Sequence, residues 1–277
     1  MESLSQYRLL ILAGGYGTRM ETGDAAPLPK PMEQIGGLPL LWHIMKGFSA
    51  QGVRKFTVLA GFRSAVIRDY FSAGPRPPRF ARYGKDPVSG RWAGALTETH
   101  LDDEELSWEV DVLDSGPGTG SGKRAFDGVS VARSYGEKGP FLLTYGDGLS
   151  NVDARELLQA HRTHGLEATV TVHYPKSRFG EVVLEGEHVT EFTEKGTASS
   201  LVNIGFMVLE SSTIDSLAQS DGLEQDFLAN LARERRLGSY MHHGFWMPID
   251  TRKELATAQE LWESRQAPWV AGPGNRA

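Results

Sequence analysis

The chain of 277 residues contains no cysteine, and that absence removes three kinds of site. A disulfide framework, a thiolate metal site and a cysteine nucleophile all need this residue, so none of them is open to the protein. The apolar run at residues 9–12 is shorter than a membrane span or the apolar part of a signal peptide. We therefore expect a protein that has no membrane partner and is located in the cytoplasm.

The chain also has no excess of basic residues. Lysine and arginine number 29 against 35 aspartates and glutamates, which gives a net charge of −6. Non-specific nucleic-acid binding depends on a basic surface, so nucleic acid is not an expected partner. A small anionic substrate is compatible with this balance, because a local cluster of lysine and arginine can hold a phosphate.

Three familiar site motifs are missing as well. The segment 116–124 is similar to a P-loop, but Pro117 takes the place of its first glycine and Arg124 that of its metal-binding serine or threonine. The Asp-x-Asp triplet expected of a glycosyltransferase metal site does not occur in the chain. The pair His242 and His243 has no third ligand at a suitable spacing, which argues against a zinc site.

Strand-like and helix-like segments alternate through the first part of the chain. The strand candidates are Arg8–Ala13, Lys55–Ala60, 110–113 and Phe141–Tyr145, and the helix candidates are 39–48, 65–71, 124–135 and 153–164. This alternation predicts an α/β fold with a doubly wound, mostly parallel, Rossmann-like sheet. Ligands of such sheets bind beyond the carboxyl ends of the strands, so functional residues are expected there.

The pattern changes after about residue 166. Four strand-like runs with short connections follow, at 169–174, 181–184, 189–192 and Val202–Leu209, and they predict a smaller mixed or antiparallel β extension. Two helices are expected near the end, at 224–235 and 251–264. The stretch 73–94 is rich in Gly, Pro and Arg and is interpreted as an excursion from the core, and the tail from Pro268 as loosely ordered. No long linker divides the chain, which favours a single domain over 1–277.

A glycine-rich loop directly after the first strand is the strongest local signal. Its residues are Leu12, Ala13, Gly14, Gly15, Tyr16, Gly17, Thr18 and Arg19. Three glycines within four positions let the backbone approach a ligand closely, and successive N–H groups there can cradle an anion. Arg19 at the end of the loop is suited to a bidentate grip on phosphate. A structural turn without a ligand is the alternative interpretation.

Three charged residues stand at positions suited to phosphate and metal chemistry. Lys30 lies between Pro29 and Pro31, which stiffen the backbone that carries its ammonium group. Asp147 lies between glycines after a predicted strand, and Asp250 precedes the last predicted helix; such carboxylates suit Mg²⁺. The alternatives are a solvated surface lysine, an ordinary Asp-Gly turn and, for Asp250, the N-cap of the helix.

The order of the motifs GGxGTR, KPM, GDG, RFG, EK and FWxPxDT is more specific than any one of them. It resembles the sugar-1-phosphate nucleotidyltransferase family, and within that family the glucose-1-phosphate cytidylyltransferase branch. The resemblance runs from about residue 10 to residue 269. The segment WEVDVLDSG at 108–116 is particularly typical of the cytidylyl branch. One departure is the run 120–123, whose extra glycine would widen a pocket for a base.

The resemblance implies a role for each matching residue. It assigns to nucleotide binding the whole glycine-rich loop together with Lys30, Thr119, Arg124 and Gly146. Arg19 would hold the β- and γ-phosphates, Lys30 would neutralise charge at the α-phosphate, and Asp147 and Asp250 would hold Mg²⁺; these four are the implied catalytic residues. It assigns to sugar-phosphate binding Gly180, Glu194, Lys195 and Asn203. Residues 1–166 would then be mainly the nucleotide-binding lobe, 167–250 mainly the sugar-phosphate-binding lobe, and 251–277 a C-terminal helix and tail.

The implied reaction is Mg²⁺-dependent transfer of a nucleotidyl group from an NTP, with CTP favoured, to a sugar 1-phosphate. With α-D-glucose 1-phosphate the products are CDP-glucose and pyrophosphate, and the resemblance also implies a homo-oligomer. The first alternative keeps this reaction but uses GTP, UTP, ATP or dTTP, or another sugar or cyclitol phosphate. A second alternative is a non-catalytic nucleotide-sugar sensor, although a sensor has no need of Lys30, Asp147 and Asp250 together.

Overall fold

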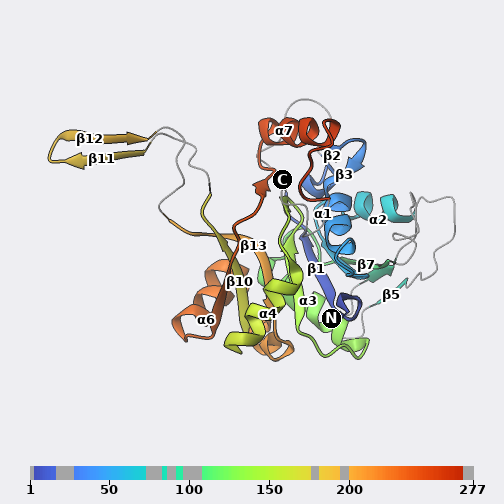
Figure 1. Cartoon of the computed structure of the whole chain (residues 1–277). Helices are drawn as coiled ribbons and strands as arrows, with labels where there is room; N and C mark the ends of the chain where they lie inside the picture. The colour runs from blue at the N-terminus through green and yellow to red at the C-terminus, as the bar shows by residue number, and fades with distance from the viewer. Residues whose placement is uncertain are drawn as a thin grey trace.

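The structure is a computed structural model that describes residues 3–16, 28–72, 83–85, 92–95, 108–175, 181–193 and 200–270. The strands of the main sheet are β1 (Arg8–Ala13), β4 (Lys55–Ala60), β5 (Tyr83–Lys85), β6 (Trp92–Ala95), β7 (Glu109–Asp114), β8 (Phe141–Tyr145), β10 (Ala168–His173), β13 (Val202–Leu209) and β14 (Leu237–Met241). They form one nine-stranded sheet in the order β14-β10-β13-β8-β1-β4-β7-β6-β5 (Figure 1).

The direction of the strands gives the sheet two different edges. β1 pairs in parallel with β4 and β8, β4 with β7, and β10 with β14. Of the nine described strands, β6 and β13 run against the others. The carboxyl ends of β1, β4, β7, β8 and β10 therefore lie at one edge, which we call the carboxyl edge, and their first residues lie at the opposite amino edge. The predicted doubly wound, mostly parallel fold is confirmed.

Helices cover both faces of the sheet. Side chains on alternate positions of β1 enter different cores: Leu9 and Ile11 pack with α1 (Leu40–Ser49), α2 (Ser64–Ser72) and α4 (Ala154–His164). Leu10 and Leu12 pack on the other face with α3 (Ser121–Ser134), α5 (Ile214–Ala218) and α6 (Ala229–Arg233). Each fully buried Leu or Ile contributes about 1.5–3 kcal/mol. This two-sided burial explains why β1 reads as a continuous apolar run rather than an alternating one.

The remaining elements surround this core. They are η1 (Leu4–Gln6), η3 (Lys30–Met32), β2 (Gln34–Ile35), β3 (Leu38–Pro39), β9 (Gly148–Ser150), β11 (Glu181–Glu185), β12 (His188–Thr193), η5 (Ser211–Thr213), the π-helix η6 (Leu223–Leu228), β15 (Trp246–Pro248) and α7 (Arg252–Glu263). In Figure 1 the β11–β12 hairpin projects away from the body, and α7 lies beyond the carboxyl edge. Within the described ranges, no helix is long and apolar enough to cross a membrane.

Three expectations for the chain need correction. The stretch 73–94 is not simply an excursion, because β5 and β6 extend the main sheet beyond β7; its other residues lie outside the described ranges. The runs that became β10 and β13 continue the main sheet, and the extension consists of the β11–β12 hairpin. The helix expected at 224–235 begins as the π-helix η6 and continues as α6. The division into two lobes stays a prediction.

The described part of the tail, 268–270, is more tightly held than expected, and its last residues, 271–277, lie outside the described ranges. Trp269 is 2% exposed, and its indole N–H donates to His43 Nδ1 at 3.3 Å. His43 Nε2 in turn donates to the carbonyl of Ile35 at 2.8 Å. This pattern requires a neutral imidazole, in agreement with burial that lowers the pKa of His43 to about 4. An aromatic anchor therefore fixes the residues around Trp269 that were expected to be loose.

Candidate functional site

Lys30 reaches the carboxyl edge from a stiff turn. Pro29 and Pro31 flank it, and η3 is closed by hydrogen bonds from Met32 N–H to the Pro29 carbonyl at 2.7 Å and from Glu33 N–H to the Lys30 carbonyl at 3.1 Å. The turn is anchored because Pro31 and Met32 are buried. The backbone that carries the Lys30 ammonium group is therefore fixed before any ligand arrives.

Asp147 follows the end of β8 in the turn that leads into β9. Gly146 N–H donates to the Leu12 carbonyl at 2.9 Å, which joins this turn to the beginning of the glycine-rich loop. A Cβ atom on Gly146 would lie 2.9 Å from Pro31 Cγ and 3.1 Å from the Leu12 oxygen. Gly146 is therefore required for space, and its absent side chain lets the segment that carries Lys30 approach Asp147.

Asp250 is held beside Asp147 by the pairing of β9 with β15. Gly148 lies opposite Pro248 in this pair, and Ile249 N–H donates to the Asp147 carbonyl at 2.8 Å. The N-cap of α7 is Thr251, whose side chain forms a capping box with Glu254. The alternative that Asp250 caps the helix is thus excluded by the structure, and its carboxylate points to Lys30 instead.

These three residues, remote in sequence, form one ion cluster. Lys30 Nζ donates to Asp147 Oδ2 at 2.8 Å and to Asp250 Oδ1 at 2.5 Å. The Lys30 side chain is 12% exposed, whereas those of Asp147 and Asp250 are 40% and 28% exposed. Burial works to lower the pKa of Lys30, but the two carboxylates outweigh it and raise the pKa above its ordinary value. Lys30 is therefore an ammonium ion at neutral pH.

The cluster has the donor chemistry of a magnesium site. One ammonium group against two carboxylates leaves one negative charge in excess, on oxygen atoms that remain partly open to solvent. Mg²⁺ prefers oxygen ligands and is commonly held by one or two carboxylates together with substrate phosphates and water. No group of three or more His, Asp or Glu side chains that could hold a metal occurs within the described ranges. Asp147 and Asp250 are the residues that would hold Mg²⁺ here.

The described part of the glycine-rich loop lies next to this cluster. Leu12 and Ala13 end β1 and are buried, while Gly15 has open space around its Cα and Tyr16 is 51% exposed. The Tyr16 ring packs against Phe62, with ring centroids 5.3 Å apart. Gly15 and Tyr16 are thus open to solvent at the carboxyl edge, and their implied contact with nucleotide stays a prediction. Gly17, Thr18 and Arg19 lie outside the described residues.

The segment that resembles a P-loop forms a different structure. Thr119 donates its hydroxyl proton to the Ser115 carbonyl and so stabilises the loop after β7. A Cβ atom on Gly120 would lie 2.3 Å from the Asp221 carbonyl oxygen, and Gly122 N–H donates to the same oxygen at 2.8 Å. The glycines of this run thus let the backbone dock against Asp221.

The sugar-phosphate side is described only in part. Asn203 lies exposed near the beginning of β13 at the carboxyl edge, and its Oδ1 accepts from Gly205 N–H at 3.0 Å. Gly180, Glu194 and Lys195 lie outside the described residues. Asn203 lies opposite Val172 in the β10–β13 pair, and its implied role stays a prediction.

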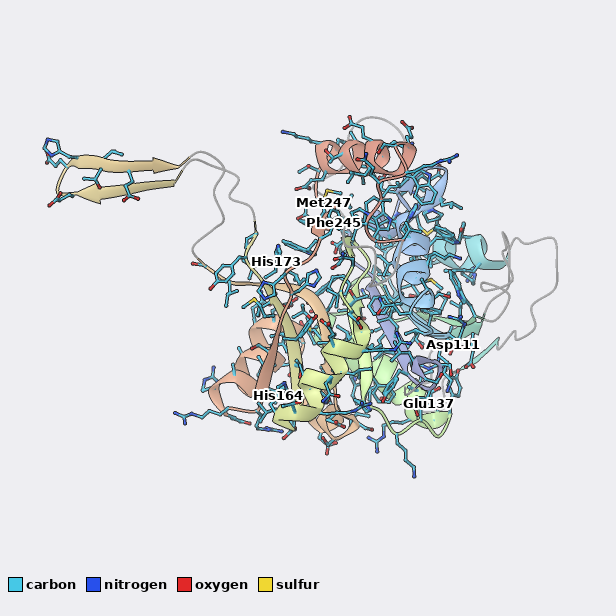
Figure 2. The ribbon with its side chains drawn as sticks, in the orientation of Figure 1. Asp111, Glu137, His164, His173, Phe245 and Met247 are labelled. Carbon is cyan, nitrogen blue, oxygen red and sulfur yellow. The ribbon has the colours of Figure 1, made fainter. Side chains whose placement is uncertain are left out.

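Sequence reasoning assigned no role to two aromatic side chains at this edge. The Trp246 indole lies over Gly148, with Nε1 3.7 Å from where a Cβ atom would be. His173 at the end of β10 packs against Trp246 with ring centroids 6.0 Å apart, and its Nδ1 donates to the His242 carbonyl at 2.9 Å. Figure 2 shows His173 close to Phe245 and Met247, which flank Trp246. The FWxPxDT motif contained the signal for Trp246, whereas nothing near His173 distinguished it.

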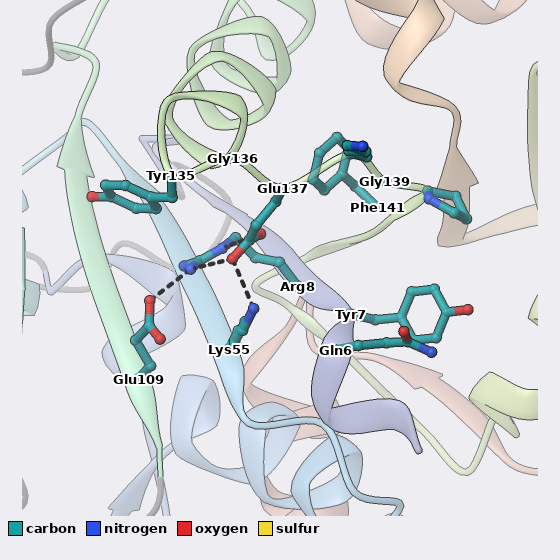
Figure 3. Close-up of a pocket in the computed structure, with 12 residues that line it drawn as sticks. Gln6, Tyr7, Arg8, Lys55, Glu109, Tyr135, Gly136, Glu137, Gly139 and Phe141 are labelled. Carbon is teal, nitrogen blue, oxygen red and sulfur yellow. Dashed lines mark hydrogen bonds and ion pairs between the residues drawn. The ribbon is translucent and has the colours of Figure 1, made fainter. Parts of the chain in front are cut away.

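A second ion cluster lies at the amino edge, beside a cavity of about 480 Å³ (Figure 3). The guanidinium group of Arg8 binds Glu137 through Nε at 2.9 Å, Glu109 through Nη2 at 2.8 Å and Asp111 through Nη1 at 2.8 Å. Lys55 also binds Glu137, at 3.1 Å. The side chain of Arg8 is fully buried, and burial together with this set of acceptors identifies a structural network.

The site and the fold agree with what comparisons with known proteins show. A doubly wound sheet with a lysine and two aspartates at its carboxyl edge is typical of enzymes that act on nucleotides. A family model described as nucleotidyl transferase matches residues 8–265, and the chain belongs to this family. The resemblance inferred from the motifs is confirmed.

Named relatives cover nearly the whole chain. It is 36% identical over 265 residues to a glucose-1-phosphate cytidylyltransferase of Salmonella typhi, with 95% of this chain and 98% of the relative covered. It is 35% identical over 266 residues to a probable glucose-1-phosphate cytidylyltransferase of Bacillus subtilis, with the same shares covered. The crystal structure of HddC from Yersinia pseudotuberculosis has the same fold, with a TM-score of 0.63 at 20% identity over 92% of this chain and 99% of that chain.

Proposed function

We propose that the protein transfers the cytidylyl group of CTP to α-D-glucose 1-phosphate, with Mg²⁺ as cofactor, and releases CDP-glucose and pyrophosphate. The observation that carries this proposal is the Lys30 ammonium group held between Asp147 and Asp250 at the carboxyl edge. The names of the two relatives that match over nearly their full length support the choice of CTP and glucose 1-phosphate.

The reaction needs positioning and charge neutralisation rather than a protein nucleophile. An oxygen of the sugar phosphate attacks the α-phosphorus, a new P–O bond forms, and the bond to the bridging oxygen breaks as pyrophosphate leaves with the electron pair. The attacking phosphate is already ionised, so no side chain has to remove a proton. Mg²⁺, when bound, supplies positive charge to the phosphates of the nucleotide.

Lys30 has the main catalytic role among the described residues. Its ammonium group would neutralise the charge that builds on the α-phosphate, and groups that are oriented in advance stabilise such charge at little reorganisation cost. The two carboxylates hold this group in place, and their contacts keep it protonated. Gly15 and Tyr16 would cradle the triphosphate, and Asn203 would contact the sugar phosphate.

A pocket that hydrogen-bonds the edge of a base discriminates strongly, because the wrong base leaves buried polar groups unpaired. We expect CTP to be preferred over UTP by about 10²-fold in kcat/KM, since UTP replaces a donor by an acceptor at position 4.

A pyrophosphate-release screen of five NTPs against a panel of sugar 1-phosphates tests the proposal. The expected result is the highest kcat/KM for CTP with α-D-glucose 1-phosphate. A preference for GTP or ATP would overturn the choice of CTP but leave the reaction class in place. Binding of nucleotide or nucleotide sugar without pyrophosphate release from any pair would instead identify a non-catalytic sensor. Assembly into a homo-oligomer stays a prediction, which light scattering of the purified protein can check.

A further inference from the structure

Arg124 is a buried arginine in the first turn of α3, and its hydrogen bonds join three loops. It is 4% exposed, and its Nη1 donates to the Ala60 carbonyl at 2.5 Å. Its Nη2 donates to the Gly116 carbonyl at 2.7 Å and to the Gly14 carbonyl at 3.2 Å. These carbonyls belong to the ends of β1, β4 and β7, which are neighbours in the sheet. One guanidinium group therefore connects the carboxyl ends of three adjacent strands.

Each of these carbonyls also takes part in the backbone of the site. The Gly14 oxygen accepts from Phe62 N–H at 3.2 Å, the Ala60 oxygen from Ser115 N–H at 3.1 Å, and the Gly116 oxygen from Thr119 N–H at 3.4 Å. The first two of these bonds link one loop to the next, the third closes the loop after β7, and the cation stabilises all three acceptors. Hydrogen bonds with a charged donor are roughly twice as strong as those of a neutral pair.

Two glycines are shaped around the same side chain. A Cβ atom on Gly14 would lie 2.1 Å from Arg124 Cζ, and one on Gly61 would lie 2.4 Å from Arg124 Nη1. Neither glycine has a positive φ, so their backbone would accept an alanine. They are required for space because the guanidinium group fills the place where their side chains would be. The first glycine after β1 and the first glycine after β4 therefore both leave space for the same residue of α3.

We propose that Arg124 is the positioning residue of the nucleotide site: it holds the loops after β1, β4 and β7 in the arrangement that receives the NTP. The inference rests on the proposed function, since it takes the NTP to bind at the loop after β1. It differs from a direct contact between Arg124 and the nucleotide, because the guanidinium group acts here through Gly14, Ala60 and Gly116.

The effect is confined to nucleotide binding. Lys30, Asp147 and Asp250 are held by η3, the β9–β15 pair and the capped start of α7. Loss of Arg124 therefore raises the KM for the NTP while the KM for the sugar phosphate stays unchanged, and kcat at saturating NTP falls much less. Arg133, exposed in the last turn of the same helix, provides the matched control.

Amide hydrogen exchange on the ligand-free protein tests the loop-holding role directly. In Arg124→Ala we expect faster exchange at Phe62, Ser115 and Thr119, whose acceptors lose the cation. The amide of Gly146, which donates to Leu12, and the variant Arg133→Ala should show no change. Unchanged exchange at the three amides would overturn the proposal, because a residue that only contacts bound nucleotide does not affect the empty loops.

Binding of a non-hydrolysable NTP analogue, measured by calorimetry, completes the test. Arg124→Ala should weaken it about 10-fold or more, the amount expected from one lost charged hydrogen bond. Gly61→Ala displaces the guanidinium group without removing it and should weaken binding as well. The double variant should bind no more weakly than Arg124→Ala, because the clash is gone.

The outcomes separate this inference from the proposed function. Faster exchange with unchanged NTP affinity would show that Arg124 stabilises the loops without affecting nucleotide binding, and would overturn the positioning role. A double variant with both losses multiplied would contradict the spatial link between Gly61 and Arg124. If the parent protein binds no NTP, the proposed function fails, whereas the exchange result stands without any ligand. Should Arg124→Ala not fold, Gly61→Ala is measured alone against Arg133→Ala.

Discussion

The ion clusters at the two edges of the sheet contain similar side chains, but they differ in how far their carboxylates are exposed to solvent. At the amino edge, the buried guanidinium group of Arg8 is bound by Glu109 and Glu137, as Figure 3 shows, and also by Asp111. At the carboxyl edge, Lys30 meets two carboxylates, and these remain 40% and 28% exposed. Asp111 and Glu137 of the Arg8 cluster are only 2% and 13% exposed, and Lys55 adds a second cation to that cluster. Both carboxylates of the Lys30 cluster are open enough to solvent to bind a further cation. The exposure of the carboxylates, more than the residue types, therefore separates the structural cluster from the candidate site.

The largest expected effect on activity comes from Asp147 in the Lys30 cluster. Asp147→Asn keeps the shape of the side chain but removes half of the charge offered to Mg²⁺, and we expect kcat/KM to fall by roughly 10²- to 10³-fold. Raised Mg²⁺ or added Mn²⁺ should restore part of the activity. Steady-state pyrophosphate release against metal concentration measures both effects.

Asp153 is the matched control for this variant. It is the N-cap of α4, and Asn caps a helix as well as Asp does. Asp153→Asn should therefore keep both activity and metal dependence. An Asp147→Asn enzyme with the metal dependence of the parent would remove Asp147 from the proposed magnesium site.

Substitution in the Arg8 cluster should lower the stability of the protein rather than its activity. Arg8→Met leaves Glu109, Asp111 and Glu137 without their shared cation, and breaking a buried ion pair from one side costs about 3–5 kcal/mol. Urea unfolding measures this loss, while the folded fraction should keep its kcat. The exposed pair of Arg68 and Asp69 gives the control, because Arg68→Met should cost at most about 1 kcal/mol. A large fall in kcat at unchanged stability would contradict the structural role of Arg8.

The pH dependence of stability should also show the contribution of Glu137 at the amino edge. Burial works to raise the pKa of Glu137, but Arg8 and Lys55 outweigh it, so the folded pKa lies below the ordinary value of 4.5. Its contribution is therefore complete above pH 4.5 and is lost as the pH falls through the lower folded pKa. Urea midpoints should fall more steeply below about pH 4.5 for the parent than for Glu137→Gln. Parallel curves would show that Glu137 is not linked to folding in this way.

The smallest expected effect concerns the helix that begins beside Asp250. Thr251→Ala removes the capping box of α7 and should cost about 1 kcal/mol of stability, with only a few-fold rise in the KM for the NTP. Thr257, exposed in the same helix, is the control, since alanine there is a better helix former. If both variants have the same unfolding midpoint, the cap contributes nothing measurable.

Sequence patterns were sufficient for the elements whose burial is regular. β1, β4 and β8 were predicted with their observed bounds because apolar residues fill both faces of the sheet. Asp153 was expected as an N-cap, and its side chain accepts from Arg155 and Glu156 N–H as such a cap does. The motifs also pointed to Lys30 and Asp147, which the structure brings into one ion cluster, while their roles in the reaction stay predictions.

Other features depended on contacts that local patterns do not encode. The choice for Asp250 between cap and cluster was decided by Thr251 and Glu254, which supply the cap themselves. The residues just before the π-helix η6, 220–222, lie against Gly120 and Gly122, and Leu223 N–H of η6 donates to Ser121 Oγ, a contact between segments about 100 residues apart. The contact of Arg124 with nucleotide stays a prediction, whereas its hydrogen bonds to loop carbonyls arise only because the folded sheet brings these loops together.

Turnover of Lys30→Ala, measured beside its thermal unfolding midpoint, tests the central claim most directly. The account predicts a fall in kcat of about 10²-fold or more, a loss of about 3 kcal/mol in transition-state stabilisation, while the fold is retained. Lys253→Ala, an exposed lysine in α7, should match the parent in both measurements. A Lys30→Ala enzyme with turnover within a few-fold of the parent would contradict the account and make the carboxyl-edge cluster a structural ion pair.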